Sequence, residues 1–110
     1  PWNLGPADSG WITAGQVADE IIRFWGSGTR EIRDTDDTRK EAKVLRLDIS
    51  KAMRELSWYP ICEIETAVEK TVRWYRELYE NRKSDPFRMC LDHLNEYVDE
   101  ARYSRASWTG

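Results

Sequence analysis

Residues 64–81, IETAVEKTVRWYRELYEN, are the stretch that decides the fold of this 110-residue chain. Apolar side chains recur in it every three or four residues, which is the spacing of one face of an α-helix. Glu69 and Arg73 are one turn apart and are expected to pair across that turn. The pattern predicts a helix over 64–81, and its apolar stripe consists of Ile64, Val68, Thr71, Val72, Tyr75, Leu78 and Tyr79.

Two shorter helices are expected before this stretch. Thr13 and Gln16 have the spacing of a capping box, which predicts a helix over 14–25. Asp48 is expected to cap a second helix, which stops before Pro60 because the residue preceding a proline disfavours helical geometry. The apolar face of this second helix consists of Ile49, Ala52, Met53 and Leu56.

A last helix is expected after residue 85. Asp85 is placed to cap it and Pro86 occupies its first position, where a proline is tolerated. Its apolar positions are Phe87, Cys90, Leu91, Leu94, Tyr97, Val98 and Ala101. The tail 103–110 is expected to fray.

Fragments of strand complete the expected fold. The opening Pro1 to Pro6 is apolar and stopped by glycine and proline, as in a buried strand that ends in a turn, and a short strand is expected at 30–33. Isolated strands are marginal in water, so the domain either folds around its helices or requires a sheet from other sequence. We therefore expect one domain over 1–110, mainly α with short strands (α+β) and with about four helices.

Composition excludes several classes of function. The chain is 40% hydrophobic and 34% charged, with no long apolar run, so no membrane role is expected. Seventeen basic and twenty acidic side chains are interleaved and give a net charge of −3, which argues against nucleic-acid binding.

The two cysteines indicate a compartment rather than a site. Cys62 and Cys90 lie within apolar patterns, which suits buried thiols in a reducing, cytoplasmic environment. Cys90 and His93 have the spacing of half a zinc site, but His93 is the only histidine and a second ligand pair is missing. We interpret both as helix residues and predict no metal site.

The usual catalytic signatures are missing from the sequence. It has no Gly-rich turn between a strand and a helix, no nucleophile elbow and no phosphate-binding loop. Glu63 and Glu65 could be read as an acid and base pair, but acids at a helix start complement its dipole without any substrate. No catalytic residue, cofactor-binding residue or cofactor is therefore predicted for this chain.

Six tryptophans are many for a chain of this size. Trp25, Trp58 and Trp74 lie at the edges of apolar stripes, where packing explains them. Trp2 and Trp11 flank a Gly-Pro loop instead, where a ring could contact a nucleotide base or cover an interface between lobes. Both interpretations remain open.

Several segments, in order, resemble one family. They are Trp2-Asn3-Leu4-Gly5-Pro6-Ala7-Asp8-Ser9, Phe24-Trp25-Gly26, Leu45-Arg46-Leu47-Asp48-Ile49-Ser50-Lys51-Ala52, Trp58-Tyr59-Pro60, Thr71-Val72-Arg73-Trp74-Tyr75 and residues 90–97. Together they are similar to the C-terminal region of CDP-glucose 4,6-dehydratases, within the extended short-chain dehydrogenases. The segment around Ser50 and the turn at Pro60 are shared widely by nucleotide-sugar epimerases and dehydratases, whereas the opening segment and the last helix point to the CDP-glucose enzymes.

The resemblance implies a substrate-binding lobe without its Rossmann domain. In this family a Rossmann lobe holds NAD, and a smaller lobe closes over the nucleotide sugar. The enzymes are lyases of polysaccharide biosynthesis that convert CDP-glucose to CDP-4-keto-6-deoxyglucose. Their catalytic Tyr-x-x-x-Lys pair and dinucleotide turn belong to the Rossmann lobe, so the chain is not expected to be catalytic by itself.

The resemblance also implies substrate-binding residues. The family asparagine matching Asn3 lies near the nucleotide diphosphate, and the segment before Asp48 often supplies a phosphate-binding arginine, for which Arg39 is the candidate. A guanidinium suits a diphosphate geometrically. The family pattern Pro-His-Glu-Ala reads Arg39-Lys40-Glu41-Ala42 here, so the loop departs at two positions. Arg39 could equally be a solvated cation that balances neighbouring aspartates. Trp11, whose ring could contact the nucleotide base, is the third expected substrate-binding residue.

Two functions follow from these observations. The first is the nucleotide-sugar-binding part of a CDP-glucose 4,6-dehydratase-like enzyme, whose partners are CDP-glucose and the missing Rossmann lobe. The second is a free-standing helical module, derived from such a lobe, that self-associates or binds a protein through exposed apolar surface.

Overall fold

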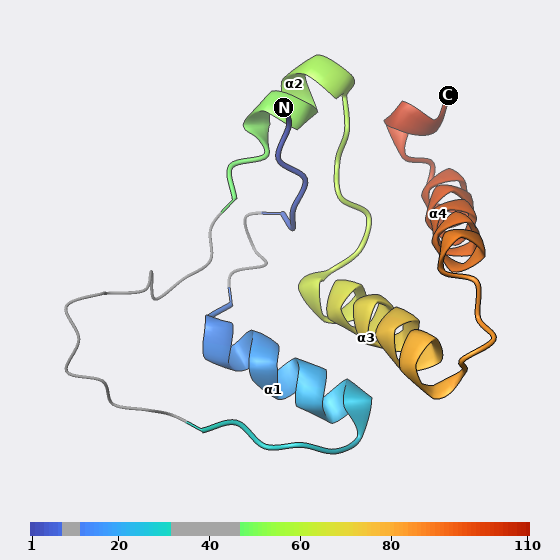
Figure 1. Cartoon of the computed structure of the whole chain (residues 1–110). Coiled ribbons are helices and arrows are strands. Elements are labelled where there is room, and N and C mark those ends of the chain that lie inside the picture. Colours follow the sequence, from blue (N-terminus) through green and yellow to red (C-terminus); the bar gives the residue numbers. More distant parts are fainter. Residues whose placement is uncertain (8–11, 32–46) are drawn as a thin grey trace.

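A computed structural model describes residues 1–7, 12–31 and 47–110 (Figure 1). Helices dominate these residues, and none of them forms a strand. None of the helices in these ranges has the length and hydrophobicity that crossing a bilayer requires. In chain order the elements are α1 (Ala14–Trp25), α2 (Ser50–Leu56), α3 (Ile64–Glu80), α4 (Pro86–Tyr103) and a short 3-10 helix, η1 (Ser107–Thr109).

The capping signals explain where α1 begins and ends. Gln16 donates its backbone N–H to Thr13 Oγ1 at 3.2 Å, and Thr13 donates its own N–H to Gln16 Oε1 at 2.8 Å. This reciprocal pair satisfies two of the backbone donors that a helix start leaves free. At the other end, Gly26 has a φ of +87°, a left-handed conformation that glycine adopts without strain. Both predicted bounds of α1 are confirmed.

The caps of α4 and α2 differ in how well the sequence locates them. Asp85 accepts a hydrogen bond from the N–H of Phe87 at 3.0 Å, which confirms the predicted start of α4. In α2 the cap position is Ile49, one residue later than predicted. Asp48 still serves the start of this helix, because its carboxylate accepts the N–H of Ser50 at 2.9 Å.

Among the described helices, α1 and α3 pack against each other most extensively. The two helices run in the same general direction, from left to right in Figure 1. Val68 and Val72 are the buried residues of α3. Trp25 at the end of α1 meets Tyr79 at the end of α3 edge to face, with ring centroids 6.3 Å apart. An ion pair between Arg23 and Glu65 also joins the two helices.

The opening segment is not the buried strand that the sequence predicts. Residues 1–7 carry no strand, and Trp2 and Leu4 are 49% and 57% exposed. The segment lies against α2 instead, where Trp2 Nε1 donates to Glu55 at 3.2 Å and Lys51 donates to the Pro1 carbonyl at 3.2 Å. A helix offers side chains rather than a row of free backbone groups, so no ladder of strand hydrogen bonds forms. The predicted strand at 30–33 is likewise missing at 30 and 31, and its remaining residues lie outside the described ranges.

The core of the described residues is small. It contains only five buried apolar residues, and no large side chain is fully buried. A core of this size contributes only modest hydrophobic stabilisation. Its members are Ile49, Ala52, Val68, Val72 and Ala101.

Candidate functional site

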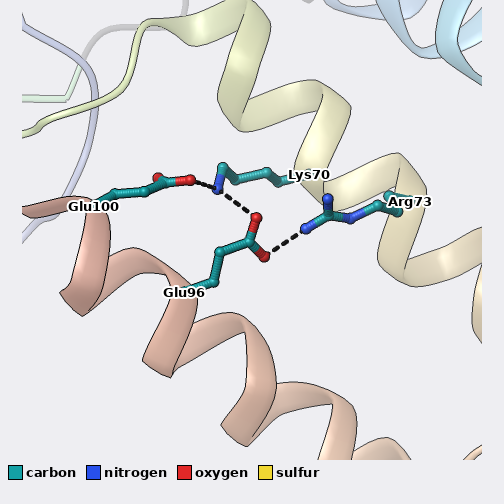
Figure 2. A network of polar contacts seen from close by, with 4 residues as sticks. All are labelled: Lys70, Arg73, Glu96 and Glu100. Carbon is teal, nitrogen blue, oxygen red and sulfur yellow. Dashed lines mark hydrogen bonds and ion pairs between the residues drawn. The ribbon is translucent and has the colours of Figure 1, made fainter.

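A charged cluster joins α3 to α4 (Figure 2). Lys70 Nζ lies 2.6 Å from Glu100 Oε1 and 3.2 Å from Glu96 Oε1. The other oxygen of the Glu96 carboxylate is 2.6 Å from Arg73 Nη2. Arg73 therefore pairs between helices rather than along α3 with Glu69 as predicted. The cluster brings two cations and two carboxylates together, so its charges balance.

Charge pairing in this cluster outweighs burial. Burial by itself would lower the pKa of Lys70, but the hydrogen bonds with Glu100 and Glu96 together raise that pKa above its usual 10.5. Burial would raise the pKa of Glu96, but Lys70 and Arg73 lower it below its usual 4.5. Both groups are therefore ionised at neutral pH, and neither is poised to exchange a proton there. The cluster is structural rather than acid–base machinery.

Beside the cluster lies an apolar groove between α3 and α4. Its volume is about 410 Å³, within the range of small-molecule sites. It is lined by Lys70, Thr71, Trp74, Tyr75, Cys90, His93, Leu94 and Tyr97. Cys90 is exposed rather than buried as predicted, because it lies on the wall of this open groove. Among the described residues no group of three metal-ligating side chains is assembled, so Cys90 and His93 are not joined by further ligands there.

Among the described residues, the indole N–H of Trp74 has no hydrogen-bond partner, although it is shielded from solvent. A buried donor without an acceptor costs about 1–3 kcal/mol. Trp74→Phe removes that donor and keeps an aromatic ring against Tyr75, which it meets edge to face at 5.1 Å. We therefore expect the free energy of unfolding of this variant to equal or exceed that of the parent by up to about 1 kcal/mol, measured by urea denaturation.

The matched control for Trp74→Phe is Trp108→Phe. The indole N–H of Trp108 does have an acceptor, the Tyr59 carbonyl at 3.1 Å. Its loss should lower stability by about 1 kcal/mol. If both variants were destabilised equally, the Trp74 donor would have to be satisfied in solution.

A second cavity lies next to Asn3, the only predicted site residue that falls in the described ranges. Asn3 is exposed, and its Nδ2 donates to the backbone oxygen of Asp48 at 3.3 Å, which ties the opening segment to the start of α2. The three residues after it form one wall of the cavity, whose volume is about 320 Å³. The cavity is lined by Leu4, Gly5, Pro6, Trp58, Pro60, Cys62, Ile64, Ala67 and Tyr97.

Trp11 and Arg39, the other predicted site residues, lie outside the described residues. Their predicted roles therefore stay predictions. The cavity adds two aromatic residues that sequence reasoning did not assign to a site, Trp58 and Tyr97. Burial raises the pKa of the Tyr97 hydroxyl, so this group stays protonated at neutral pH. Burial likewise raises the pKa of the Cys62 thiol, which makes it a weak nucleophile.

Comparison with known proteins relates part of the chain to an enzyme family. A curated protein, the CDP-glucose 4,6-dehydratase of Salmonella typhimurium, is 31% identical to this chain over 75 residues. The chain is a distant relative of that enzyme family. The matched residues make up 68% of the chain but only 21% of the Salmonella dehydratase, so the chain corresponds to about a fifth of that protein's length. No protein-family model matches the chain, and no solved structure matches it.

The fold is organised around amphipathic helices. The cavity near Asn3 lies where the opening segment meets the segment that joins α2 to α3. Its walls are almost entirely apolar and aromatic, which suits the contact surface of a planar or apolar group rather than that of a charged one.

Proposed function

We propose that this chain is the C-terminal, nucleotide-sugar-binding part of a CDP-glucose 4,6-dehydratase-like enzyme. The observation that carries the proposal is the 31% identity over 75 residues to the Salmonella dehydratase. In this proposal Asn3, Trp11 and Arg39 contact the nucleotide sugar, and CDP-glucose is the preferred ligand. The chain forms one substrate-side lobe over residues 1–110.

The chemistry is assigned to a Rossmann lobe that pairs with this one. No NAD contact is proposed for this chain, because the Gly-rich turn that holds the NAD diphosphate in a Rossmann lobe is missing from its sequence. The chain is therefore proposed to bind and position the substrate without catalysing the reaction. Asn3 supports this role, since its anchored amide lies at the exposed end of a segment that borders a cavity.

A nitrogen–proton NMR correlation spectrum tests the proposal. The 110-residue chain is titrated separately with CDP-glucose, UDP-glucose and CDP. We expect CDP-glucose and CDP to shift the Asn3 side-chain amide, the Trp11 indole N–H and the Arg39 amide, and UDP-glucose to shift them less. Asn3→Asp should weaken binding about tenfold, because a carboxylate replaces a donor next to the diphosphate. Asn95→Asp makes the same change on α4 and should leave binding unaltered.

A second function is favoured by one observation on α3 and α4. Large apolar side chains on these helices are exposed, which is the usual mark of a surface that a protein covers. They include Tyr75, Tyr79, Phe87, Leu91 and Leu94. If the chain is a self-associating module, the translational diffusion measured on the same NMR samples will slow with concentration and the spectrum will ignore all three ligands. A well-dispersed spectrum with that behaviour would replace the nucleotide-sugar proposal.

A further inference from the structure

The last seven residues fold back over the end of α4. Arg105 has a φ of +57°, which reverses the chain just after the helix. Ala106 then donates its N–H to the carbonyl of Ala101 at 2.9 Å, and Arg105 donates to Arg102 at 3.0 Å. The reversal directs η1 back toward the body of the molecule. Residues 103–110, for which the sequence predicts fraying, thus hold defined hydrogen bonds at their start.

Trp108 in η1 makes two contacts with the rest of the chain. Its ring stacks on Tyr97 of α4, with centroids 5.8 Å apart and planes within 16°. Its Nε1 donates to the carbonyl of Tyr59 at 3.1 Å, although the two residues are 49 positions apart in the sequence. The side chain is partly buried by these contacts. Trp108 therefore connects α4 to the segment that joins α2 to α3.

Tyr97 and the segment that joins α2 to α3 both form walls of the cavity near Asn3. Tyr97 lines it directly, together with Cys62, and Trp58 and Pro60 flank Tyr59 and also line it. Trp108 is not itself a lining residue, so it contacts these walls from outside the cavity. A side chain that stacks on one wall and hydrogen-bonds to the other fixes their separation.

We propose that residues 104–110 form a latch, in which Trp108 holds Tyr97 against the segment that joins α2 to α3. The latch thereby restricts access to the cavity and to Cys62. Within the described part of the chain, the Trp108 side chain has one hydrogen bond and one ring stack with these walls, so the latch can open without unfolding α4. Each contact of this kind shifts the equilibrium between the closed and open latch by roughly tenfold or less. This inference does not depend on which ligand the cavity takes.

The rate of alkylation of Cys62 by iodoacetamide tests the latch. It is measured on the full chain in a Cys90→Ser background, because Cys90 is exposed and would react first. We expect Trp108→Ala to raise the Cys62 rate about tenfold, since both contacts are lost, and Trp108→Phe to raise it roughly threefold, since the stack remains. Tyr103→Ala is the matched control, because it removes an aromatic ring at the same end of α4 that is 94% exposed.

Equal Cys62 rates in the parent and in Trp108→Ala would overturn the latch. If Trp108→Ala loses its helical circular dichroism, the comparison of Trp108→Phe with Tyr103→Ala decides instead, and equal rates in those two would overturn it as well. The heteronuclear nitrogen–proton NOE of residues 107–109 gives an independent check on the unaltered chain. Values as high as those of α4 support the latch, and the low values of a frayed tail contradict it.

Discussion

Val72→Asp is expected to lower the free energy of unfolding by about 4 kcal/mol, which is enough to unfold a chain with so small a core. Val72 is 4% exposed on α3 and is one of five buried apolar residues in the described ranges. A carboxylate there would lose its hydration without gaining a partner, or it would have to take up a proton. Circular dichroism at 222 nm with urea denaturation measures the loss.

Leu94→Asp is the control for the buried position. Leu94 is an apolar residue in the middle of a helix, like Val72, but it is 64% exposed on α4. Its substitution should change stability by less than about 1 kcal/mol. Equal losses in the two variants would mean that α4 packs against another surface in solution, as the self-association hypothesis requires.

Lys70→Glu is expected to lower the free energy of unfolding by about 2 kcal/mol, which is the second largest loss expected after that of Val72→Asp. Lys70 is 20% exposed and contacts both Glu96 and Glu100, so the substitution would place three carboxylates together. Lys83→Glu makes the same charge change at an exposed position in the turn between α3 and α4 and should have little effect. Urea denaturation at pH 7 compares the two variants with the parent.

The difference in stability between the parent and Lys70→Glu should depend on pH, because the pKa values of Lys70 and Glu96 are shifted in the folded parent. The pKa of Glu96 is lowered in the folded chain, so its contribution is present above the usual value of 4.5 and is lost as the pH falls through the lower folded value. The pKa of Lys70 is raised, so its contribution is present below 10.5 and is lost as the pH rises through the higher folded value. The difference between the parent and Lys70→Glu should therefore be largest between these limits and should shrink in acid. A difference that stays constant down to pH 2 would show that charge is not its cause.

Local signals predicted the helices well, because caps and apolar periodicity act within a few residues. The start of α1 at its capping box and the start of α4 at Asp85 both depend on side chains next to the helix. The opening strand was wrong because a strand is defined by its neighbour, and nothing in Pro1 to Pro6 specifies that α2 will lie there. Arg73 likewise pairs with Glu96 of α4 rather than with Glu69, because spacing within α3 cannot show that a carboxylate of another helix lies within reach.

The candidate site was harder to predict. Periodicity shows which face of a helix is apolar but not whether another element covers it, so Cys90 was expected to be buried and is exposed. Tyr97 could be placed on the apolar face of α4 from spacing alone, but its position in a cavity with Cys62 depends on the turn before α3. Trp108 had no periodic neighbours to mark it, so its contacts with Tyr97 and Tyr59 could not be predicted from the sequence.

The two residues of the core with no exposed surface at all are Ala52 and Ala101, which are also its smallest. Where an alanine is completely enclosed, neighbouring atoms have closed to the distance that a single methyl group permits, and a larger side chain would force them apart. As related sequences diverge, these two positions should therefore accept little beyond alanine, glycine or serine. The half-buried aromatic positions around the cavities, where a ring can be exchanged for another of similar size, should vary more freely.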